Sequence, residues 1–272
     1  MNLTIQDLLE SGVHLGHKLR RYNPRCKNFI FDQRYGISII DLEKTQSQVT
    51  AACNFLEKLV ASGKNVLFVG TKKQSQETIR EAAVECQMPF AVNRWMGGAL
   101  TNHSTIERSV KKYKKYIGME ADGTLAKLPK KEVSAIRREM SRMLRNLEGI
   151  VEMEKKPGAI FIIDTKSEAI ALSEANRIGI PVVALVDTNA DPSLVDYPIM
   201  GNDDSVKSIR IIVESITQAV KNGISQRKVE VQTKEDALLK NEEVKEEQLP
   251  VTAHSQKETM EVPTSFSTDV DG

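Results

Sequence analysis

Short apolar runs alternate with longer amphipathic stretches along most of the chain. Residues 65–70, 159–164 and 181–187 are apolar at nearly every position and rich in Val and Ile. Continuous runs of this kind predict parallel strands that are covered on both faces, because a half-exposed strand would alternate apolar and polar residues. Two shorter runs, at 28–31 and 37–41, are candidates for further strands.

Helical spacing fills the segments that follow these strands. Residues 42–61, 73–87, 166–178 and 205–222 carry apolar residues three and four positions apart, as one buried helix face requires. Strands that alternate with helices through short connections predict an α/β fold with a doubly wound parallel sheet.

Residues 104–154 break this alternation. They contain no strand pattern, and their apolar residues form two heptad-like series separated by a glycine-containing break at 118–123. The first series is Ile106, Val110, Tyr113 and Ile117, and the second is Val133, Ile136, Met140, Met143, Leu147 and Ile150. This spacing predicts an inserted antiparallel coiled-coil hairpin, with a capping box from Ser104 to Glu107 and with Pro129 at the start of the second helix.

Charge is distributed unevenly along the chain. The net charge is +1, but residues 229–272 carry eleven acidic and four basic side chains, and residues 1–228 carry a net +8. The acidic segment has few large apolar residues, so we predict that it is a disordered tail. The predicted organisation is an α/β domain in two parts, 1–103 and 155–228, with the hairpin inserted between them and the tail following.

Composition narrows the class of protein further. Of the 272 residues, 40% are hydrophobic and 28% are charged, and no apolar run is long enough to span a membrane. The N-terminal residues lack the basic and apolar regions of a secretory signal. The three cysteines, Cys26, Cys53 and Cys86, are too far apart to predict a disulfide framework or a zinc knuckle. We therefore expect a cytoplasmic protein with no membrane partner.

Most of the excess positive charge lies on the predicted hairpin. From Ser104 to Arg145 there are twelve Lys or Arg and five acidic residues, a net charge of +7. A charge run is usually a solvated helix face, but charge of one sign segregated on one element favours contact with a nucleic acid. The residues that we expect to make this contact are Arg108, Lys111, Lys112, Lys114, Lys115, Arg137, Arg138, Arg142 and Arg145.

A second basic cluster lies near the N-terminus and comprises Lys18, Arg20, Arg21, Arg25 and Lys27. Together with Tyr22 it is suited to phosphate contacts and to stacking on unpaired bases. Lys72 lies where a predicted strand passes into a helix, and it is a further candidate for a phosphate contact. Arg94 and Trp95 are also candidates, although Trp95 is equally suited to the core at the root of the hairpin.

The sequence offers little support for catalysis. It has no Gly-x-x-x-x-Gly-Lys-Ser/Thr loop, no Gly-x-Gly-x-x-Gly and no Gly-x-Ser-x-Gly elbow. His14 and His17 lack the further ligands of a zinc site, and we expect both rings to hydrogen-bond to the backbone. An ion held by His17, Asp187 and Asp203, beside Asp204 near predicted strand ends, stays an open alternative. We expect no enzyme, no cofactor and no metal.

Several segments together carry a family resemblance. They are Gly12-Val-His14-Leu-Gly16-His17, Asn23-Pro24, Ile39-Ile-Asp-Leu-Glu-Lys44-Thr45, Phe68-Val-Gly-Thr-Lys72, Arg94-Trp95-Met-Gly97-Gly98-Ala-Leu-Thr101-Asn102, Gly179-Ile-Pro181-Val, Asp187-Thr-Asn189-Ala-Asp191-Pro192 and Gly201-Asn202-Asp203-Asp204. In this order, over roughly residues 3–224, they closely resemble the universal S-two family, small-subunit ribosomal protein two. The hairpin resembles the bacterial and organellar branch. Tyr22, Cys26, Met200 and Ser205 depart from the residues common in the family, which affects packing details only.

The resemblance implies a flavodoxin-like sheet with a coiled-coil hairpin. It also implies a structural role in the small ribosomal subunit, against ribosomal RNA and neighbouring small-subunit proteins, and help in anchoring the S-one ribosomal protein that captures messenger RNA. Two competing functions are a nucleotide- or flavin-binding enzyme on the same sheet and a free RNA-binding regulator. A complete phosphate loop would have favoured the enzyme, and sedimentation apart from small subunits would favour the regulator.

Overall fold

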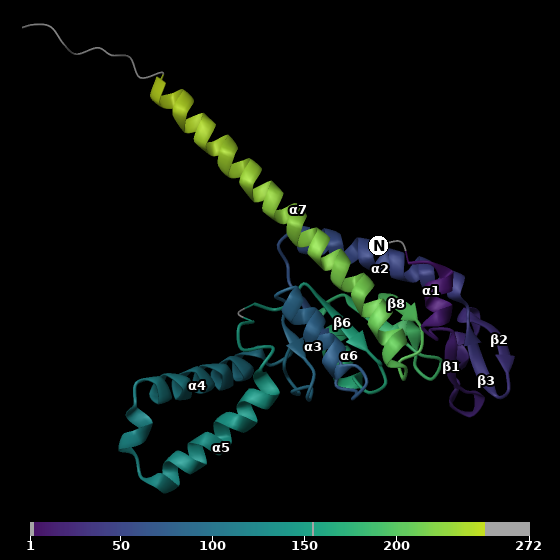
Figure 1. Cartoon of the computed structure of the whole chain (residues 1–272), viewed down its shortest axis with the longest axis horizontal. Helices are drawn as coiled ribbons and strands as arrows, with labels where there is room; N and C mark the ends of the chain where they lie inside the picture. Colours follow the sequence, from purple (N-terminus) through teal and green to yellow (C-terminus); the bar gives the residue numbers. More distant parts are fainter. Residues whose placement is uncertain (1–2, 154, 248–272) are drawn as a thin grey trace, which may run out of the picture. The chain divides into compact units, whose positions relative to one another are not determined.

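The computed structural model describes residues 3–153 and 155–247, with side chains up to Val229 apart from Ala126. The chain divides into two units, Met1–Val229 and Glu230–Gly272. The helices are α1 (Ile5–Glu10), α2 (Leu42–Ala61), α3 (Gln76–Glu85), α4 (His103–Ala121), α5 (Lys130–Leu147), α6 (Ala169–Ile178) and α7 (Val206–Glu247) (Figure 1). The strands are β1 (Leu15–Lys18), β2 (Ile30–Arg34), β3 (Ile37–Ile40), β4 (Val66–Val69), β5 (Phe90–Ala91), β6 (Ala159–Ile163), β7 (Val182–Val186) and β8 (Tyr197–Met200). No described helix combines the length and the apolar character that crossing a bilayer requires.

Five strands form one parallel sheet in the first unit. Their order across the sheet is β5-β4-β6-β7-β8, and every neighbouring pair runs parallel. Numbered along the chain, this is the order 2-1-3-4-5, which is common among doubly wound sheets. The register is continuous through the middle of the sheet, since Phe68 pairs with Phe161, which pairs with Val183. The prediction of an α/β fold with a parallel sheet is confirmed.

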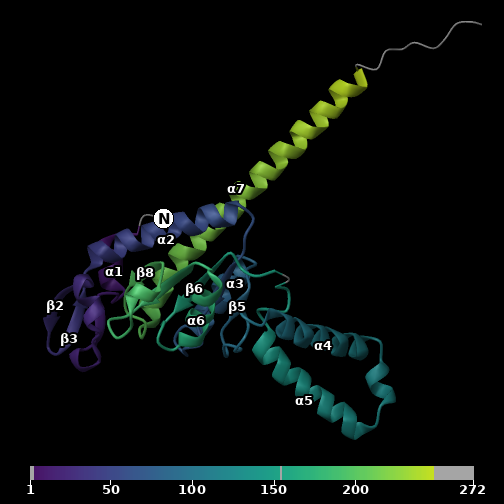
Figure 2. The ribbon, with the colours of Figure 1, turned by 180° about the vertical axis from the view of Figure 1, so that it is seen from behind.

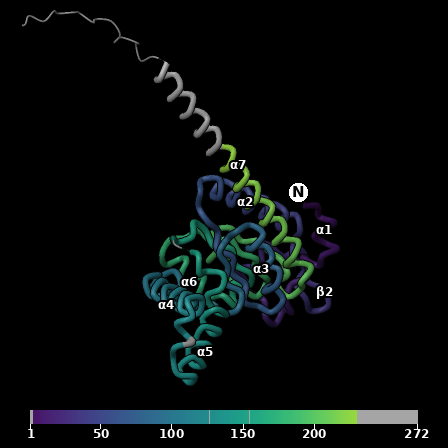
Figure 3. The backbone as a smooth tube through the Cα atoms, turned by 60° about the vertical axis from the view of Figure 1, so that its left-hand side comes forward, coloured from purple at the N-terminus to yellow at the C-terminus, as the bar shows by residue number. Residues whose placement is uncertain are grey.

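Helices cover both faces of this sheet (Figures 2 and 3). On one face Phe68 and Phe161 pack with apolar residues of α2, α3 and α7. On the other face Leu67 and Ile160 belong to a second core that includes residues of α6 and the first and last turns of α4 and α5. Every residue of β4, β6 and β7 is buried, as expected of runs that are apolar at each position. These two cores supply most of the hydrophobic stabilisation, because each large buried side chain contributes ~1.5–3 kcal/mol.

A three-stranded antiparallel sheet precedes the parallel sheet along the chain. Its order is β1-β3-β2, and β2 joins β3 through a turn at Tyr35 and Gly36. The candidate strands at 28–31 and 37–41 correspond to β2 and β3. The pattern does not predict β1, because its four residues, Leu-Gly-His-Lys, show no alternation of apolar and polar positions.

Two strands of the parallel sheet also lack a sequence signal. β5 has only two residues, Phe90 and Ala91, which is too short for any periodicity. β8 contains Pro198, which cannot donate a hydrogen bond to a neighbouring strand. Both strands lie at the edges of the sheet, where one side of each strand needs no partner.

Between β5 and β6 the chain forms α4, a 3-10 turn at Thr124–Lys127, and α5. Pro129 is the N-cap of α5, in agreement with its predicted place at the helix start. The predicted capping box is wrong, because α4 begins at His103 and its N-cap is Asn102, which makes no side-chain capping hydrogen bond. Ser104 therefore lies inside the first turn, where its hydroxyl donates to Asn102 Oδ1 at 3.4 Å.

The predicted boundary of the acidic tail is also corrected. The sequence predicts disorder from residue 229, but α7 continues to Glu247. Composition explains the difference, since residues 224–247 contain no Gly or Pro and are rich in Lys, Glu, Ala and Leu, which are strong helix formers. Residues 248–272 of the predicted tail lie outside the described residues.

Truncation after Val229 tests whether the first unit folds without the segment that follows it. The described core residues of α7 all lie between Ile209 and Ile224. We therefore expect the truncated chain to unfold cooperatively in calorimetry with a Tm within about 4 °C of the full-length value, the shift that ~1 kcal/mol would produce. Truncation after Ser205, which removes the core face of α7, serves as the control and should abolish the transition. A broad, uncooperative transition for the first truncation would contradict the prediction.

Candidate nucleic-acid interface and the polar cluster at the sheet edge

The segment formed by α4 and α5 presents its basic side chains to solvent. All nine cations predicted to contact a nucleic acid here, from Arg108 to Arg145, are exposed. Figures 1 and 2 show that the two helices lie closest near the sheet and separate toward the turn that connects them. The basic faces of both helices are therefore accessible along their length.

Three of these nine cations are partnered by acidic residues of the same segment. The pairs and their N–O distances are Lys112–Glu139 (2.6 Å), Arg137–Glu120 (3.6 Å) and Lys111–Glu107 (2.8 Å). Exposed pairs of this kind contribute at most ~1 kcal/mol each. Within the part of the chain that the structure describes, the other six cations form no salt bridge, and these are Arg108, Lys114, Lys115, Arg138, Arg142 and Arg145.

The apolar seam between α4 and α5 is incomplete. Ile106, Tyr113 and Leu147 are buried, but Ile117 keeps 44% of its surface exposed and Met140 is only half-buried. The seam thus loosens with distance from the root, in keeping with the separation of the helices in Figures 1 and 2.

The N-terminal basic cluster lies on β1 and on the 3-10 turns that follow it. Its five members, Lys18, Arg20, Arg21, Arg25 and Lys27, are all exposed. The guanidinium of Arg25 already pairs with Asp191 and donates to Ser193 Oγ at 3.1 Å. Tyr22 is half-buried against the second core, so the predicted stacking of a base on this ring is not supported.

Lys72 faces carboxylates and not solvent. Its Nζ lies 2.7 Å from Asp203, 2.6 Å from Asp204 and 3.5 Å from Asp164, and its side chain is only 17% exposed. Burial lowers the pKa of Lys72, but the hydrogen bonds to Asp203 and Asp204 outweigh it and raise the pKa above its ordinary value. The predicted phosphate contact of Lys72 is therefore wrong, because three carboxylates already neutralise its charge.

His17 joins these carboxylates at the carboxyl edge of the parallel sheet. Its Nδ1 lies 2.9 Å from Asp187 Oδ2, so the expected backbone hydrogen bond of this ring is wrong, and the hydrogen bond to Asp187 raises the pKa of His17. Burial and the neighbouring carboxylates raise the pKa of Asp203 to about 7. One atom from each of His17, Asp187 and Asp203 lies within 4.8 Å of the others, so the ion-binding alternative has the necessary ligand spacing. Lys72 supplies a positive charge at the same place, which already offsets part of the carboxylate charge.

Glu174 of α6 holds the loop that leads into α4. Its carboxylate accepts hydrogen bonds from Trp95 Nε1 (3.1 Å), the backbone N–H groups of Gly98 (2.7 Å), Leu100 (3.1 Å) and Thr101 (3.1 Å), and the Thr101 hydroxyl (3.1 Å). Burial alone would raise the pKa of Glu174, but these hydrogen bonds outweigh it and lower the pKa. A carboxylate with this many donors is satisfied although the residue is 8% exposed.

Trp95 belongs to the core at the root of α4 and α5. It is 8% exposed and shares the second core with Ile106 and Leu147. The structural alternative for Trp95 is therefore supported and its predicted RNA contact is wrong, because the ring is covered. Arg94 beside it is exposed and stays a candidate.

Sequence reasoning missed Glu174, although a signal was present. Glu174 lies between Leu172 and Ala175 and three residues after Ala171, all of them on the buried face of α6. An acidic residue at a core position of a helix indicates a buried partner, because an unpaired carboxylate there would be costly.

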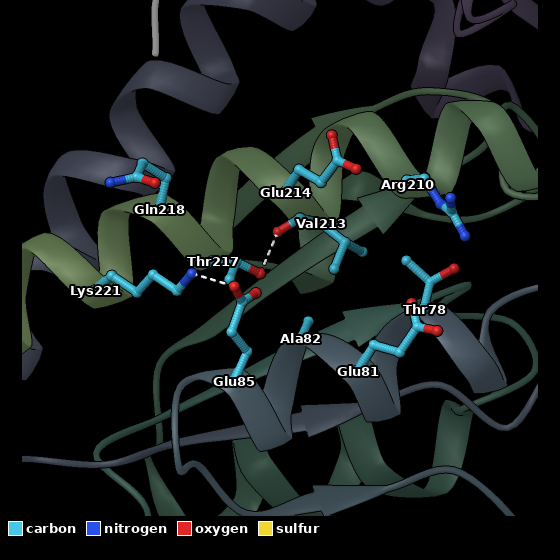
Figure 4. Close-up of a pocket in the computed structure, with 10 residues that line it drawn as sticks. All are labelled: Thr78, Glu81, Ala82, Glu85, Arg210, Val213, Glu214, Thr217, Gln218 and Lys221. Atoms are coloured by element: carbon cyan, nitrogen blue, oxygen red, sulfur yellow. Dashed lines mark hydrogen bonds and ion pairs between the residues drawn. The ribbon is translucent and has the colours of Figure 1, made fainter.

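A groove of about 350 Å³ lies between α3 and α7, which run beside each other in Figure 3. Figure 4 shows charged side chains from both helices around it, with Lys221 paired to Glu85 across the groove. None of the ten residues that line it is a histidine or a cysteine. The groove therefore offers neither an imidazole base nor a thiol nucleophile.

Comparison with known proteins identifies the family. The model of the family ribosomal protein S2 matches residues 8–223. The chain belongs to the ribosomal protein S2 family. Its relatives include proteins named small ribosomal subunit protein uS2, from Opitutus terrae (58% identical, 84% of this chain and 75% of the relative covered), Treponema pallidum (53%; 80% and 75%) and Borrelia duttonii (45%; 90% and 97%). The resemblance that the sequence motifs carry is confirmed.

Substitution Glu174→Gln tests the root of the basic segment. The amide of Gln would turn an N–H₂ group toward backbone N–H donors, so we expect a loss of roughly 2–4 kcal/mol in the free energy of unfolding. Trp95, the single tryptophan of the chain, reports on the same joint, and its fluorescence should shift to the red in the folded variant. Urea unfolding followed by this fluorescence measures both effects. Glu81→Gln, at an exposed position of α3, is the control and should change neither.

The same variant has a defined pH dependence. The folded-state pKa of Glu174 lies below its ordinary value of 4.5, so its stabilising contribution is complete above pH 4.5 and declines as the pH falls further. The difference in stability between the wild type and Glu174→Gln should thus be constant from pH 8 to pH 5 and narrow below that range. A difference that widens at acid pH would show that the carboxylate is not the stabilising form.

Proposed function

We propose that this protein is a structural constituent of the small ribosomal subunit in the cytoplasm and that it binds the ribosomal RNA of that subunit. Membership of the ribosomal protein S2 family, which is structural and non-enzymatic, supports the first part and removes the enzyme alternative. Neighbouring small-subunit proteins are proposed partners, and the S-one protein is included on the basis of the family resemblance alone.

One observation carries the RNA-binding part of the proposal. Six cations without a carboxylate partner lie on α4 and α5, within a segment whose outer faces are exposed. Such cations gain little from the folded protein itself, whereas each phosphate that they neutralise would release counterions and strengthen binding. The proposed RNA-contacting residues are the nine of α4 and α5 with Lys18, Arg20, Arg21, Arg25, Lys27 and Arg94.

We further propose that residues 1–103 and 155–228 form one flavodoxin-like domain and that residues 104–154 form a coiled-coil hairpin inserted into it. The strand order of the parallel sheet supports the first statement. The cross-helix pair Lys112–Glu139 and the buried residues Ile106, Tyr113 and Leu147 support the second, because they link α4 to α5.

Reversal of charge on α4 tests the RNA contact. Lys114 and Lys115 are exposed and form no described salt bridge, so Lys114→Glu with Lys115→Glu should leave the fold intact. We expect weaker incorporation into small subunits, measured by sedimentation of assembled particles, and a smaller salt dependence of RNA binding by about one unit per lost phosphate contact. The control is Lys58→Glu with Lys207→Glu, which makes the same change in net charge at exposed positions of α2 and α7.

The outcomes separate the competing functions. Full incorporation of the α4 variant at physiological salt would contradict the RNA contact. A wild-type protein that binds RNA but never travels with small subunits would instead support the free regulator.

Hydrogen exchange tests whether RNA completes the hairpin. The seam loosens toward Ile117, and Lys111 and Lys115 are like charges four positions apart, which costs a few tenths of a kcal/mol. In the free protein, we expect amides 106–148 to exchange faster than those of β4 and β7. In assembled subunits the difference should shrink, because phosphates would relieve the repulsion and favour the closed form. Equal protection in the free protein would show that the seam suffices without RNA.

A further inference from the structure

Two aromatic rings on the antiparallel sheet make no contribution to either core. Tyr35 is 101% exposed and Phe31 is 74% exposed, which makes them the most exposed large apolar side chains among the described residues. Phe31 lies on β2, where the register with β3 shifts between Ile30 and Asp32. The irregularity leaves Phe31 without a partner in the β2–β3 register.

Tyr35 also occupies a backbone position that does not suit it. Tyr35 and Gly36 both have positive φ, 50° and 75°, in the turn that joins β2 to β3. A two-residue turn of this kind strongly prefers Asn or Asp before the glycine, because bulky side chains are strained there. Neither turn geometry nor packing therefore explains a tyrosine at this position, and an unfavourable side chain that contacts nothing indicates a function outside the fold.

Cations surround the two rings. From Lys18 to Arg34 the chain carries six basic residues and one acidic residue, Asp32. Lys18 and Arg34 are both in register with Ile37, from opposite neighbouring strands, so the two cations lie in one row next to the turn. Exposed rings beside cations of one sign are the combination that binds unpaired nucleotides, in which the rings stack on bases and the cations neutralise phosphates.

We propose that the hairpin of β2 and β3 is a binding site for unpaired RNA bases, with Phe31 and Tyr35 as the stacking rings and Lys18 and Arg34 as the phosphate contacts. The six-to-one excess of positive charge favours a polyanion over a protein surface as the occupant. The inference rests on the proposed RNA-binding function and deepens it, because the basic faces of α4 and α5 have no exposed ring of comparable exposure and suit backbone contacts alone.

The variant Phe31→Thr with Tyr35→Asn removes both rings while it respects the local structure. Thr is well accommodated in a strand, and Asn before Gly36 is the preferred residue for the turn, so the variant should fold at least as well as the wild type. The control is Val84→Thr with Ile170→Thr, which changes two apolar residues that are each 62% exposed on α3 and α6. Circular dichroism melting checks the fold of all variants.

Fluorescence anisotropy of the full chain with a labelled single-stranded oligoadenylate of about 12 nucleotides provides the main measurement. We expect the ring variant to bind about tenfold more weakly or worse, with an unchanged slope of log affinity against log salt, because no phosphate contact is lost. Binding to an RNA duplex of the same length should not change. The α4 variant with Lys114→Glu and Lys115→Glu should show the opposite behaviour, a reduced salt slope for both ligands.

Each alternative outcome has a distinct meaning. If the wild type binds neither RNA, the proposed RNA-binding function fails before the inference is reached. If the α4 variant loses affinity while the ring variant binds the oligonucleotide like the wild type, the inference alone is overturned. An equal loss on single strand and duplex would also overturn it, since the rings would then not read unpaired bases. Normal RNA binding with poor assembly into small subunits would assign the rings to a protein neighbour.

Discussion

A buried carboxylate connects the parallel sheet to the basic segment on which the proposed function depends. Glu174 sits on α6, which packs on the sheet, and its five hydrogen bonds all go to the loop that enters α4. Three of these donors are backbone amides, so the carboxylate fixes the path of the main chain itself. Gly98 within this loop has a φ of +85°, which lets its N–H turn toward the carboxylate at little conformational cost.

The exit from α5 is fastened to the same region by close backbone packing. Phe90 of β5 donates its N–H to the carbonyl of Gly149 at 3.0 Å, and a Cβ on Gly149 would lie 2.1 Å from the Phe90 carbonyl oxygen. Asn93 adds a hydrogen bond of 2.6 Å to the carbonyl of Arg145. Entry and exit are therefore both anchored near β5, and the direction in which the cations point is determined by the sheet and not by the loose seam between the helices.

The sequence predicts the core of the fold well because buried parallel strands leave an unambiguous pattern. β4, β6 and β7 are apolar at every position and buried at every position. The pattern fails where burial does not choose the residues, as at the two-residue β5, at β8 with Pro198, and in α7 beyond Val229, where propensity alone extends the helix. The same distinction applies to the cations. Charge along the chain identifies Lys114 and Lys115 correctly as exposed, but it cannot show that Lys72, an identical residue type, is surrounded by three carboxylates that lie more than ninety residues away in sequence.

Partner contacts thus separate the cations of this protein into two kinds with different physical roles. Lys72 is held by Asp203 and Asp204, and with His17 and Asp187 it joins the loops that follow β4, β7 and β8 into one polar network. Removing such a cation would leave buried carboxylates unpaired, which is a cost to the fold. Lys114 and Lys115 stabilise nothing in the described structure, and their mutual repulsion opposes it slightly. Residues that are neutral or unfavourable for folding yet exposed together indicate selection for binding, and this reasoning applies equally to Tyr35, whose ring lies entirely in solvent on a strained turn. The folded core and the proposed RNA-binding surfaces are therefore built from the same residue types, and the local supply of carboxylates and apolar neighbours decides which role each residue has.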